Sequence, residues 1–288
     1  MNKKLRALVG VAVLVLTTVL FVRYIHSHPS LATQLGNVPL ITLFILVLLT
    51  CCVSGALMLI LHYSLRLCGA TIPAKENVLL TIYSSIVNFF GPLQSGPGFR
   101  AVYLKRRHKV NFKDFVRFSL LYYAFFAFFS ALFLFVPSLV WWQTGIILTA
   151  VIAICWGALH YKHISLTKLS QPYLFKLALA TLLQVCLVVF IYFIELRAVD
   201  SNVSLRQAIT YTGAANFALF VSLTPGAIGF RESFLLLANR LHHVPNDVVI
   251  TASVIDRAVY LVFLGLLFVA ALGLHAKDKL QIKSHPSD

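Results

Sequence analysis

The sequence has few charged residues, and acidic residues are especially scarce. Only 11% of its 288 residues are charged and nine are Asp or Glu, whereas 59% are hydrophobic and the mean hydropathy is +0.87. A chain of this composition has too little polar surface to cover a soluble globule of the same length. The shortage argues against a soluble protein and predicts a membrane-embedded one.

The sequence also lacks the motifs of common catalytic and metal sites. It contains no HExxH, GxSxG or Walker sequence, and no aspartate cluster of the kind that holds Mg²⁺. His160 and His163 have helical spacing, but no carboxylate accompanies them, which disfavours a metal site. The five cysteines lack CxxC spacing and mostly lie in apolar runs, which indicates packing between helices. We therefore expect no catalytic residue, metal or cofactor, and a protein that is not an enzyme.

Positive charge, by contrast, is abundant, with a net charge of +15. The Lys and Arg residues lie in short clusters between apolar runs, an arrangement that matches the cytoplasmic face of a membrane. We expect no nucleic-acid binding, because the usual folds and patches for it are missing. The charge pattern predicts a multi-pass protein of the cell (inner or plasma) membrane, with both termini in the cytoplasm.

Six apolar runs are long enough to cross about 30 Å of hydrocarbon. They cover residues 7–22, 38–63, 115–136, 139–160, 173–196 and 249–275. The first run follows Lys3, Lys4 and Arg6 and resembles a signal peptide, but no small-residue cleavage site follows it, so we expect a retained span. The prediction is an all-α polytopic membrane protein with about six full transmembrane helices.

Two further apolar segments, 78–90 and 208–223, are short for a span and run into turns rich in Pro and Gly. The turns cover 91–98 and 224–229. If both segments crossed the membrane, the basic cluster at 100–113 would lie outside, against the positive-inside bias. We therefore predict two re-entrant, broken helical hairpins, one dipping into the membrane from each side.

Both turns end in the same tripeptide. Gly-Phe-Arg at 98–100 recurs at 229–231, and Thr81 matches Thr212 at the same offset of 131 positions. Two full crossings, 115–136 and 139–160, lie between the first span of repeat 1 (38–63) and the first span of repeat 2 (173–196), so the second repeat enters from the opposite face. The sequence thus predicts an inverted repeat, which places a binding site near the bilayer midplane in many secondary transporters.

We expect a single integral membrane domain over residues 1–288 with five parts. They are a first span with an external loop (1–37), repeat 1 (38–137), a linking span (138–172), repeat 2 (173–275) and a cytoplasmic tail (276–288). The partners expected for such a domain are a membrane phospholipid or glycolipid, and then a membrane protein or a second copy of the chain.

The two turns also predict an anion site. Irregular backbone cannot face lipid, so the turns must be buried in protein or line a wet cavity. Helices that begin near Phe99 and Phe230 would direct free N–H groups toward it, and the arginines add planar donors suited to phosphate. Charged groups in the last span usually pair or face a cavity. The predicted substrate-binding residues are Pro92, Gly98, Arg100, Pro225, Gly226, Gly229, Arg231, Glu232, Asp256 and Arg257.

Plainer interpretations stay open at this point. Both arginines could be interfacial anchors whose side chains extend to water. Asp256 and Arg257 would lie at the interface if the last span began nearer residue 258, and either Asp256 or Glu232 could pair with Arg257. Asn88 and Asn216, which precede the turns, are expected to have structural roles.

The second turn resembles a known family. Residues 222–232, Ser-Leu-Thr-Pro-Gly-Ala-Ile-Gly-Phe-Arg-Glu, are similar to the Pro-Gly-Gly-Ile-Gly-x-Arg-Glu motif of the lysylphosphatidylglycerol synthase transmembrane-region family. That family includes the flippase domain of the multiple peptide resistance factor. Arg257 matches an arginine common in the last span of the family. The chain departs from the motif at Ala227, which stands in place of a glycine, and its methyl group narrows close backbone approach.

The first turn resembles an earlier Pro…Gly…Arg…Leu element of the same family, in Pro92, Gly98, Arg100 and Leu104, but has Ala101 where an acidic residue is expected. The resemblance covers nearly the whole chain and implies a membrane protein that handles lipids. Family members that aminoacylate lipids carry a separate soluble synthetase domain. We expect none here, because only a short tail follows the last predicted span.

Residues and resemblance together predict a flippase-like or scramblase-like lipid transporter. It would bind an anionic head group, of a phospholipid or a lipid-linked glycan, at the two re-entrant loops. One alternative is a non-catalytic membrane partner of a glycosyltransferase or of an envelope-biogenesis complex. A second alternative is a lipid-modifying membrane enzyme, for which Glu232 and Asp256 are the only good candidates for an acid or base.

An inverted repeat makes a testable prediction about topology. In a chain whose native cysteines have been replaced, single cysteines at Arg107 and Leu241 should react with a membrane-impermeant maleimide from opposite sides of the membrane. The reason is that residue 107 lies in the predicted cytoplasmic cluster and residue 241 follows the second turn. Permeabilised membranes, in which both positions should react, are the control. Labelling of both from one side would remove the inverted repeat.

Overall fold

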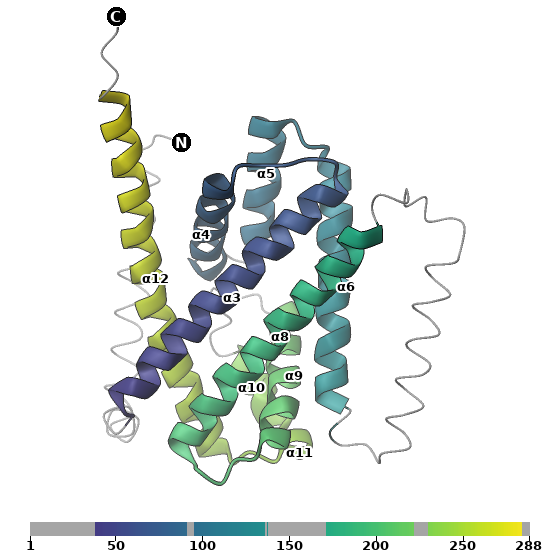
Figure 1. Ribbon diagram of the computed structural model, residues 1–288. Coiled ribbons are helices and arrows are strands. Elements are labelled where there is room, and N and C mark those ends of the chain that lie inside the picture. The colour runs from purple at the N-terminus through teal and green to yellow at the C-terminus, as the bar shows by residue number, and fades with distance from the viewer. Residues whose placement is uncertain (1–37, 91–94, 136, 138–170, 222–229, 284–288) are drawn as a thin grey trace, which may run out of the picture.

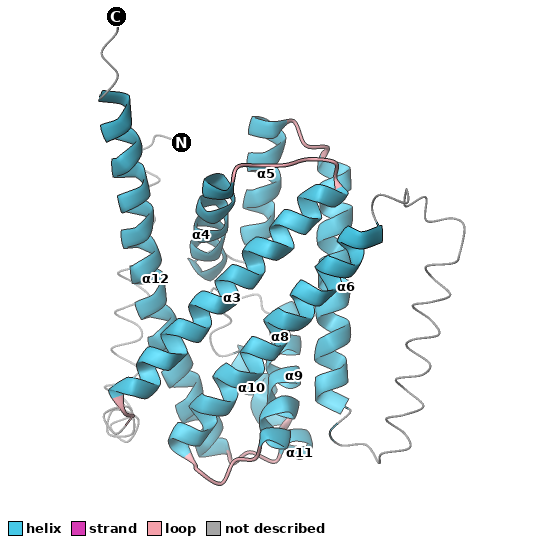
Figure 2. Ribbon diagram, in the orientation of Figure 1, coloured by secondary structure: helices cyan, strands magenta, loops and turns pink. Residues whose placement is uncertain are grey.

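The structure, a computed structural model, describes residues 38–90, 95–135, 137, 171–221 and 230–283 (Figure 1). The regular secondary structure of this part of the chain is helical, without strands (Figure 2). The helices are α3 (Leu40–Leu67), α4 (Ala74–Phe90), α5 (Gly96–His108), α6 (Phe112–Phe135), α8 (Gln171–Val199), α9 (Leu205–Val221), α10 (Phe230–Leu237), α11 (Asn239–His242) and α12 (Asn246–Lys283). The predicted all-α class is confirmed.

Four of these helices are long and apolar enough to cross a membrane: α3, α6, α8 and the Asn246–Leu267 part of α12. They coincide with four of the six predicted spans, which confirms a polytopic membrane protein. The other two predicted spans, 7–22 and 139–160, lie outside the described residues. The last helix continues beyond the predicted end of its span, to Lys283.

The short segments before the two turns form α4 and α9, of 17 residues each. Each packs against the helix that follows its turn, α4 against α5 and α9 against α10. Residues 91–94 of the first predicted turn and all of the second, 224–229, lie outside the described residues, whereas residues 96–98 of the first predicted turn are helical and belong to α5. The re-entrant path therefore stays a prediction, and the predicted site residues Pro92, Pro225, Gly226 and Gly229 fall in these same segments.

The helix order of the first half recurs in the second half. α8 begins 131 residues after α3, and α9 begins and ends 131 residues after α4. α3 and α8 pack side by side as two diagonal helices with opposite chain directions (Figure 1). The described connections of the first half, 68–73 and 109–111, lie at one end of the molecule, and those of the second half, 200–204 and 243–245, at the other (Figure 2). This arrangement supports the predicted inverted repeat.

The two halves also meet where α6 packs against α9. Gly213 of α9 lies against the backbone of Leu134 in α6, where an added Cβ would overlap backbone N and Cα atoms. Nearby, Asn216 Nδ2 donates a hydrogen bond to the buried Ser130 Oγ at 3.2 Å. Asn88, in the first half, accepts from the backbone N–H of Gly96 at 3.3 Å and so holds the start of α5.

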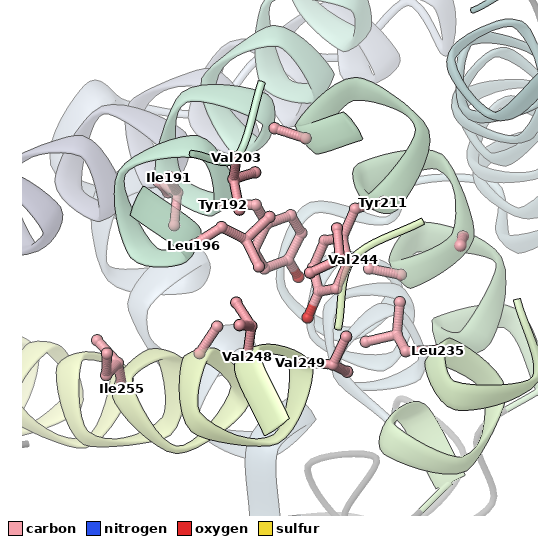
Figure 3. Close-up of a cluster of buried hydrophobic side chains, with 14 of the residues drawn as sticks. Ile191, Tyr192, Leu196, Val203, Tyr211, Leu235, Val244, Val248, Val249 and Ile255 are labelled. Atoms are coloured by element: carbon pink, nitrogen blue, oxygen red, sulfur yellow. The ribbon is translucent and has the colours of Figure 1, made fainter. Parts of the chain in front are cut away.

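The largest apolar core lies in the second half. Buried side chains of α8, α9, α10 and α12 gather around the rings of Tyr192 and Tyr211, which meet edge to face with centres 5.3 Å apart (Figure 3). Their hydroxyl ends lie next to each other among the apolar side chains (Figure 3). The burial of these apolar side chains holds α8, α9 and α12 together, and it thereby positions the polar groups that the three helices carry.

One carboxylate, that of Glu76, holds the start of α4 against the end of α5; we call these the outer ends of the two helices. Glu76 of α4 accepts a hydrogen bond from Tyr103, contacts His108 Nε2 at 2.8 Å and pairs with Arg107 at 3.3 Å, all from α5. Burial alone would raise the pKa of Glu76, but the hydrogen bonds from Tyr103 and His108, with the charges of His108 and Arg107, lower the pKa overall. The ionised carboxylate therefore fixes the outer ends of this helix pair.

The close approach at Gly213 can be tested with a matched glycine. Gly213→Ala is expected to lower the free energy of unfolding by about 1–3 kcal/mol, because backbone cannot move aside as a flexible side chain does. Gly265→Ala in α12 has open space around its Cβ and should be neutral or stabilising by up to about 1 kcal/mol. Thermal unfolding of both variants in the same detergent measures the difference; equal melting temperatures would contradict the close approach.

Candidate functional site

Arg231, in the first turn of α10, is buried between helices. Its side chain is only 9% exposed, its Nη1 donates a hydrogen bond to Asp256 Oδ2 of α12 at 2.6 Å, and its guanidinium carbon lies 5.3 Å from the centre of the Tyr192 ring of α8. A buried arginine with a carboxylate partner and an aromatic neighbour is not an anchor that extends to water. Arg231 instead connects α10 with α12 and faces α8.

The next residue of each helix forms a second ion pair. Arg257 Nη2 of α12 donates to Glu232 Oε1 of α10, and both side chains are mostly buried. Of the two partners that the sequence left open for Arg257, the structure has Glu232. Removing one partner of a buried ion pair lowers the free energy of unfolding by about 3–5 kcal/mol. We call the two pairs, Arg231 with Asp256 and Arg257 with Glu232, the crossed ion pairs, because each helix supplies one arginine and one carboxylate. They fix the register of α10 against α12.

A further acidic residue, Glu195 of α8, belongs to the same site, and the sequence analysis missed it. Glu195 is fully buried, and neither carboxyl oxygen has a hydrogen-bond partner in the described part of the chain. Asp256 and Arg231 are the charged groups that act on it, although Asp256 lies outside ordinary hydrogen-bond geometry. An acidic residue in an apolar span usually has a function, which was the available indication.

Buried polar side-chain atoms without a hydrogen bond concentrate around Arg231. Within the described residues they belong to Glu195, Tyr211, Arg231 and Ser253. Arg231 keeps two unused donor groups, Nε and Nη2, while Glu195 has both oxygens unused. Each buried polar atom that stays without a hydrogen bond lowers the stability of the folded protein by about 1–3 kcal/mol. We call these four residues together with Asp256 the Arg231 cluster; its unused donors and acceptors suit a polar ligand.

Arg100 is the matching arginine of the first half, and its surroundings differ. Its Nε donates to Ser84 Oγ of α4 at 2.6 Å, and Tyr122 and Tyr123 of α6 are the ionisable groups near it. Tyr122 in turn donates to Gln184 Oε1 at 3.1 Å. Among the described residues no carboxylate forms an ion pair with Arg100. Arg100 thus faces tyrosines of α6, whereas Arg231 faces a carboxylate of α12.

Of the predicted site residues, the structure brings four together in one set of contacts: Arg231, Glu232, Asp256 and Arg257. Arg100 belongs to a second set, with Ser84 and the tyrosines of α6. Gly98 precedes it on an open side of α5, where an added Cβ would contact nothing within 4 Å. The helix starts also agree with expectation in part, because α10 begins at Phe230 whereas α5 begins three residues before Phe99, at Gly96.

The Arg231–Asp256 pair is suited to a test by paired substitution. Asp256→Asn is expected to lower the free energy of unfolding by about 3–5 kcal/mol, because it leaves the Arg231 charge buried without a partner. The double variant Arg231→Met with Asp256→Leu removes both charges and should recover much of that loss. Arg107→Gln breaks the pair of a 69% exposed arginine with Glu76 and should cost less than about 1 kcal/mol.

Unfolding of these variants in a common detergent gives the comparison. A double variant that is no more stable than Asp256→Asn alone would show that the two side chains are not coupled.

Comparison with known proteins places the chain in a family. A family model described as the lysylphosphatidylglycerol synthase TM region matches residues 6–267. No curated protein and no solved structure gave a significant match. The matched region contains both Gly-Phe-Arg tripeptides and all four residues of the crossed ion pairs. The chain therefore belongs to the family of lysylphosphatidylglycerol synthase transmembrane regions.

Proposed function

We propose that this protein moves an anionic lipid between the leaflets of the cell membrane, as a flippase-like or scramblase-like transporter, and that Arg100 binds the phosphate of the lipid head group. The observation that carries the proposal is the state of Arg100, a partly buried cation with no carboxylate partner among the described residues. Membership of a family named for a lipid synthase supports a role in lipid handling.

The contacts of Arg100 suit a phosphate. Ser84 Oγ accepts a hydrogen bond from Nε of the guanidinium, and in the described part of the chain the side chain of Arg100 forms no other hydrogen bond. Its terminal nitrogens are then the donors for an incoming anion, in the fork geometry that matches phosphate oxygens. A cation in a weakly polar environment is costly without a counter-ion, so an anion that arrives there is stabilised.

Arg231 offers the second binding position, with weaker net attraction. Its charge is already balanced by Asp256, and an anion there must share or displace that carboxylate. Arg100 lies in the second turn of α5 and Arg231 in the first turn of α10, and within the described residues Arg231 alone of the two has a carboxylate partner. This difference supports a path with a loading position and a release position. The ion pair of Glu232 with Arg257 joins the same two helices, α10 and α12, and so holds the second position in place.

The charge distribution supports an orientation for this path. Lys105, Arg106 and Arg107 lie at the outer end of α5, beside the connection 109–111. Under the positive-inside bias that end faces the cytoplasm, and Arg100 is reached from the cytoplasmic leaflet. The sequence has no ATPase motif, so the movement is passive, coupled to an ion gradient or driven by a partner.

Leaflet exchange in vesicles tests the proposal. The protein is reconstituted into phosphatidylcholine vesicles containing a trace of fluorescent phosphatidylglycerol, and an impermeant reductant bleaches the label in the outer leaflet. Wild-type protein is expected to expose inner-leaflet label faster than empty vesicles do. Arg100→Ala should slow this exchange by about tenfold or more, the loss of one charge-assisted contact. Arg106→Ala, an equal charge change at an exposed position of the same helix, should not slow it.

Two results would contradict the proposal. One is a wild-type rate equal to that of empty vesicles, and the other is full activity in Arg100→Ala. A stable complex with a glycosyltransferase, found in place of leaflet exchange, would favour the scaffold alternative. A chemically altered lipid would favour the enzyme alternative.

A further inference from the structure

The two ion pairs leave no positive charge to balance an ionised Glu195. Arg231 with Asp256 and Arg257 with Glu232 are each neutral as pairs. An ionised Glu195 would add one negative charge, fully buried and without a hydrogen bond among the described residues. Such an isolated charge costs many kcal/mol, and the group takes up a proton instead. In the arrangement that the structure shows, the charge balance is satisfied when Glu195 carries a proton.

The ionisable groups around Glu195 come from each helix packed against it. They are Tyr192 on α8 itself, Tyr211 on α9, Arg231 on α10 and Asp256 on α12. Tyr260 of α12 lies near Asp256, and the ring of His242 in α11 contacts the ring of Tyr211. The ionisable groups of α3 nearest to α8 are His62 and Arg66, close to Lys176 at the opposite end of α8, and the cysteines Cys51 and Cys52 are exposed. From α6, Tyr122 contacts α8 at Gln184, three turns away. Arg231 is therefore the one cation beside Glu195 in the described structure.

We propose that Glu195 binds the proton that accompanies an anionic head group at Arg231, so that proton and lipid are transported together. The inference rests on the proposed function and names its coupling ion. It stands on geometry: a fully buried carboxyl group with two unused oxygens lies beside an arginine whose Nε and Nη2 are unused.

The coupling follows from electrostatics within the Arg231 cluster. A phosphate on Nε and Nη2 of Arg231 places negative charge near Glu195, which only the protonated acid tolerates, and its O–H can donate to a phosphate oxygen. When Glu195 releases that proton to the water on the open side, its carboxylate takes the same two donors and displaces the phosphate. Glu195 thus holds its proton before the anion binds, and proton and anion leave together. A pH difference then drives lipid from the acidic to the alkaline side.

A transport experiment tests the coupling. Vesicles of phosphatidylcholine and phosphatidylglycerol carry the wild-type chain, and fluorescent phosphatidylglycerol is followed at several pH values and with an imposed pH difference. The wild-type rate should fall with rising pH by up to about tenfold per unit, the limit for one proton. Glu195→Gln, which resembles the protonated acid in shape and charge, should keep exchange but lose both the pH dependence and net accumulation. Asp247→Asn, an exposed acidic position at the start of α12, should behave as wild type.

An infrared measurement tests the proton without relying on transport. Purified wild-type protein at neutral pH should show the carbonyl stretch of a protonated carboxyl group, and Glu195→Gln should lack it while Asp247→Asn keeps it. Addition of short-chain phosphatidylglycerol should shift this band in wild type, because the O–H then donates to phosphate.

The outcomes separate the two proposals. Wild-type vesicles without any leaflet exchange would overturn the proposed function, and the infrared band would still decide whether Glu195 holds a proton that responds to the anion. A band that is missing in wild type, or that remains in Glu195→Gln, would overturn the inference. Gradient-driven accumulation by Glu195→Gln equal to that of wild type would overturn it as well.

Discussion

Charged side chains inside a protein that spans a membrane must find partners within it, because hydrocarbon offers neither water nor counter-ions. Here that constraint produces the crossed ion pairs of α10 with α12, Arg231 with Asp256 and Glu232 with Arg257. They hold a short helix of eight residues against the last span. The tyrosine-centred core around α8 and α9 surrounds them and lowers the local polarity, which makes each lost partner costly.

The two halves of the molecule use one backbone plan for different chemistry. Each half has a long helix, a helix of 17 residues, a Gly-Phe-Arg tripeptide and a further span. The side chains opposite the arginine differ, since α6 brings Tyr122 and Tyr123 to Arg100 whereas α12 brings Asp256 to Arg231. Ala101 also stands where the second half has Glu232. The two arginines thus occupy matching positions of the two halves, and within the described residues Arg100 has no carboxylate partner, whereas Arg231 belongs to a neutral ion pair.

Prediction from the sequence succeeded where a single segment carries the information. Apolar length identified the four spans that the structure describes, and Pro and Gly marked where α4 and α9 end. Helical starts near the two tripeptides followed from the same breaks. Partnerships were harder to predict, because they join residues 25 positions apart on different helices. Glu195 was missed for the same reason: its burial is caused by α9 and α12, and nothing in its own segment shows that.

By itself, then, the amino-acid sequence determined the membrane class, the spans in the described residues, the duplicated tripeptide and the excess of basic residues at one set of connections, since each depends on composition or local pattern. Only the tertiary structure decided which arginine is neutralised and which carboxyl group has no hydrogen-bond partner among the described residues. The physical reason is that a charge in low dielectric takes its state from the groups packed around it, and packing brings those groups from distant parts of the chain.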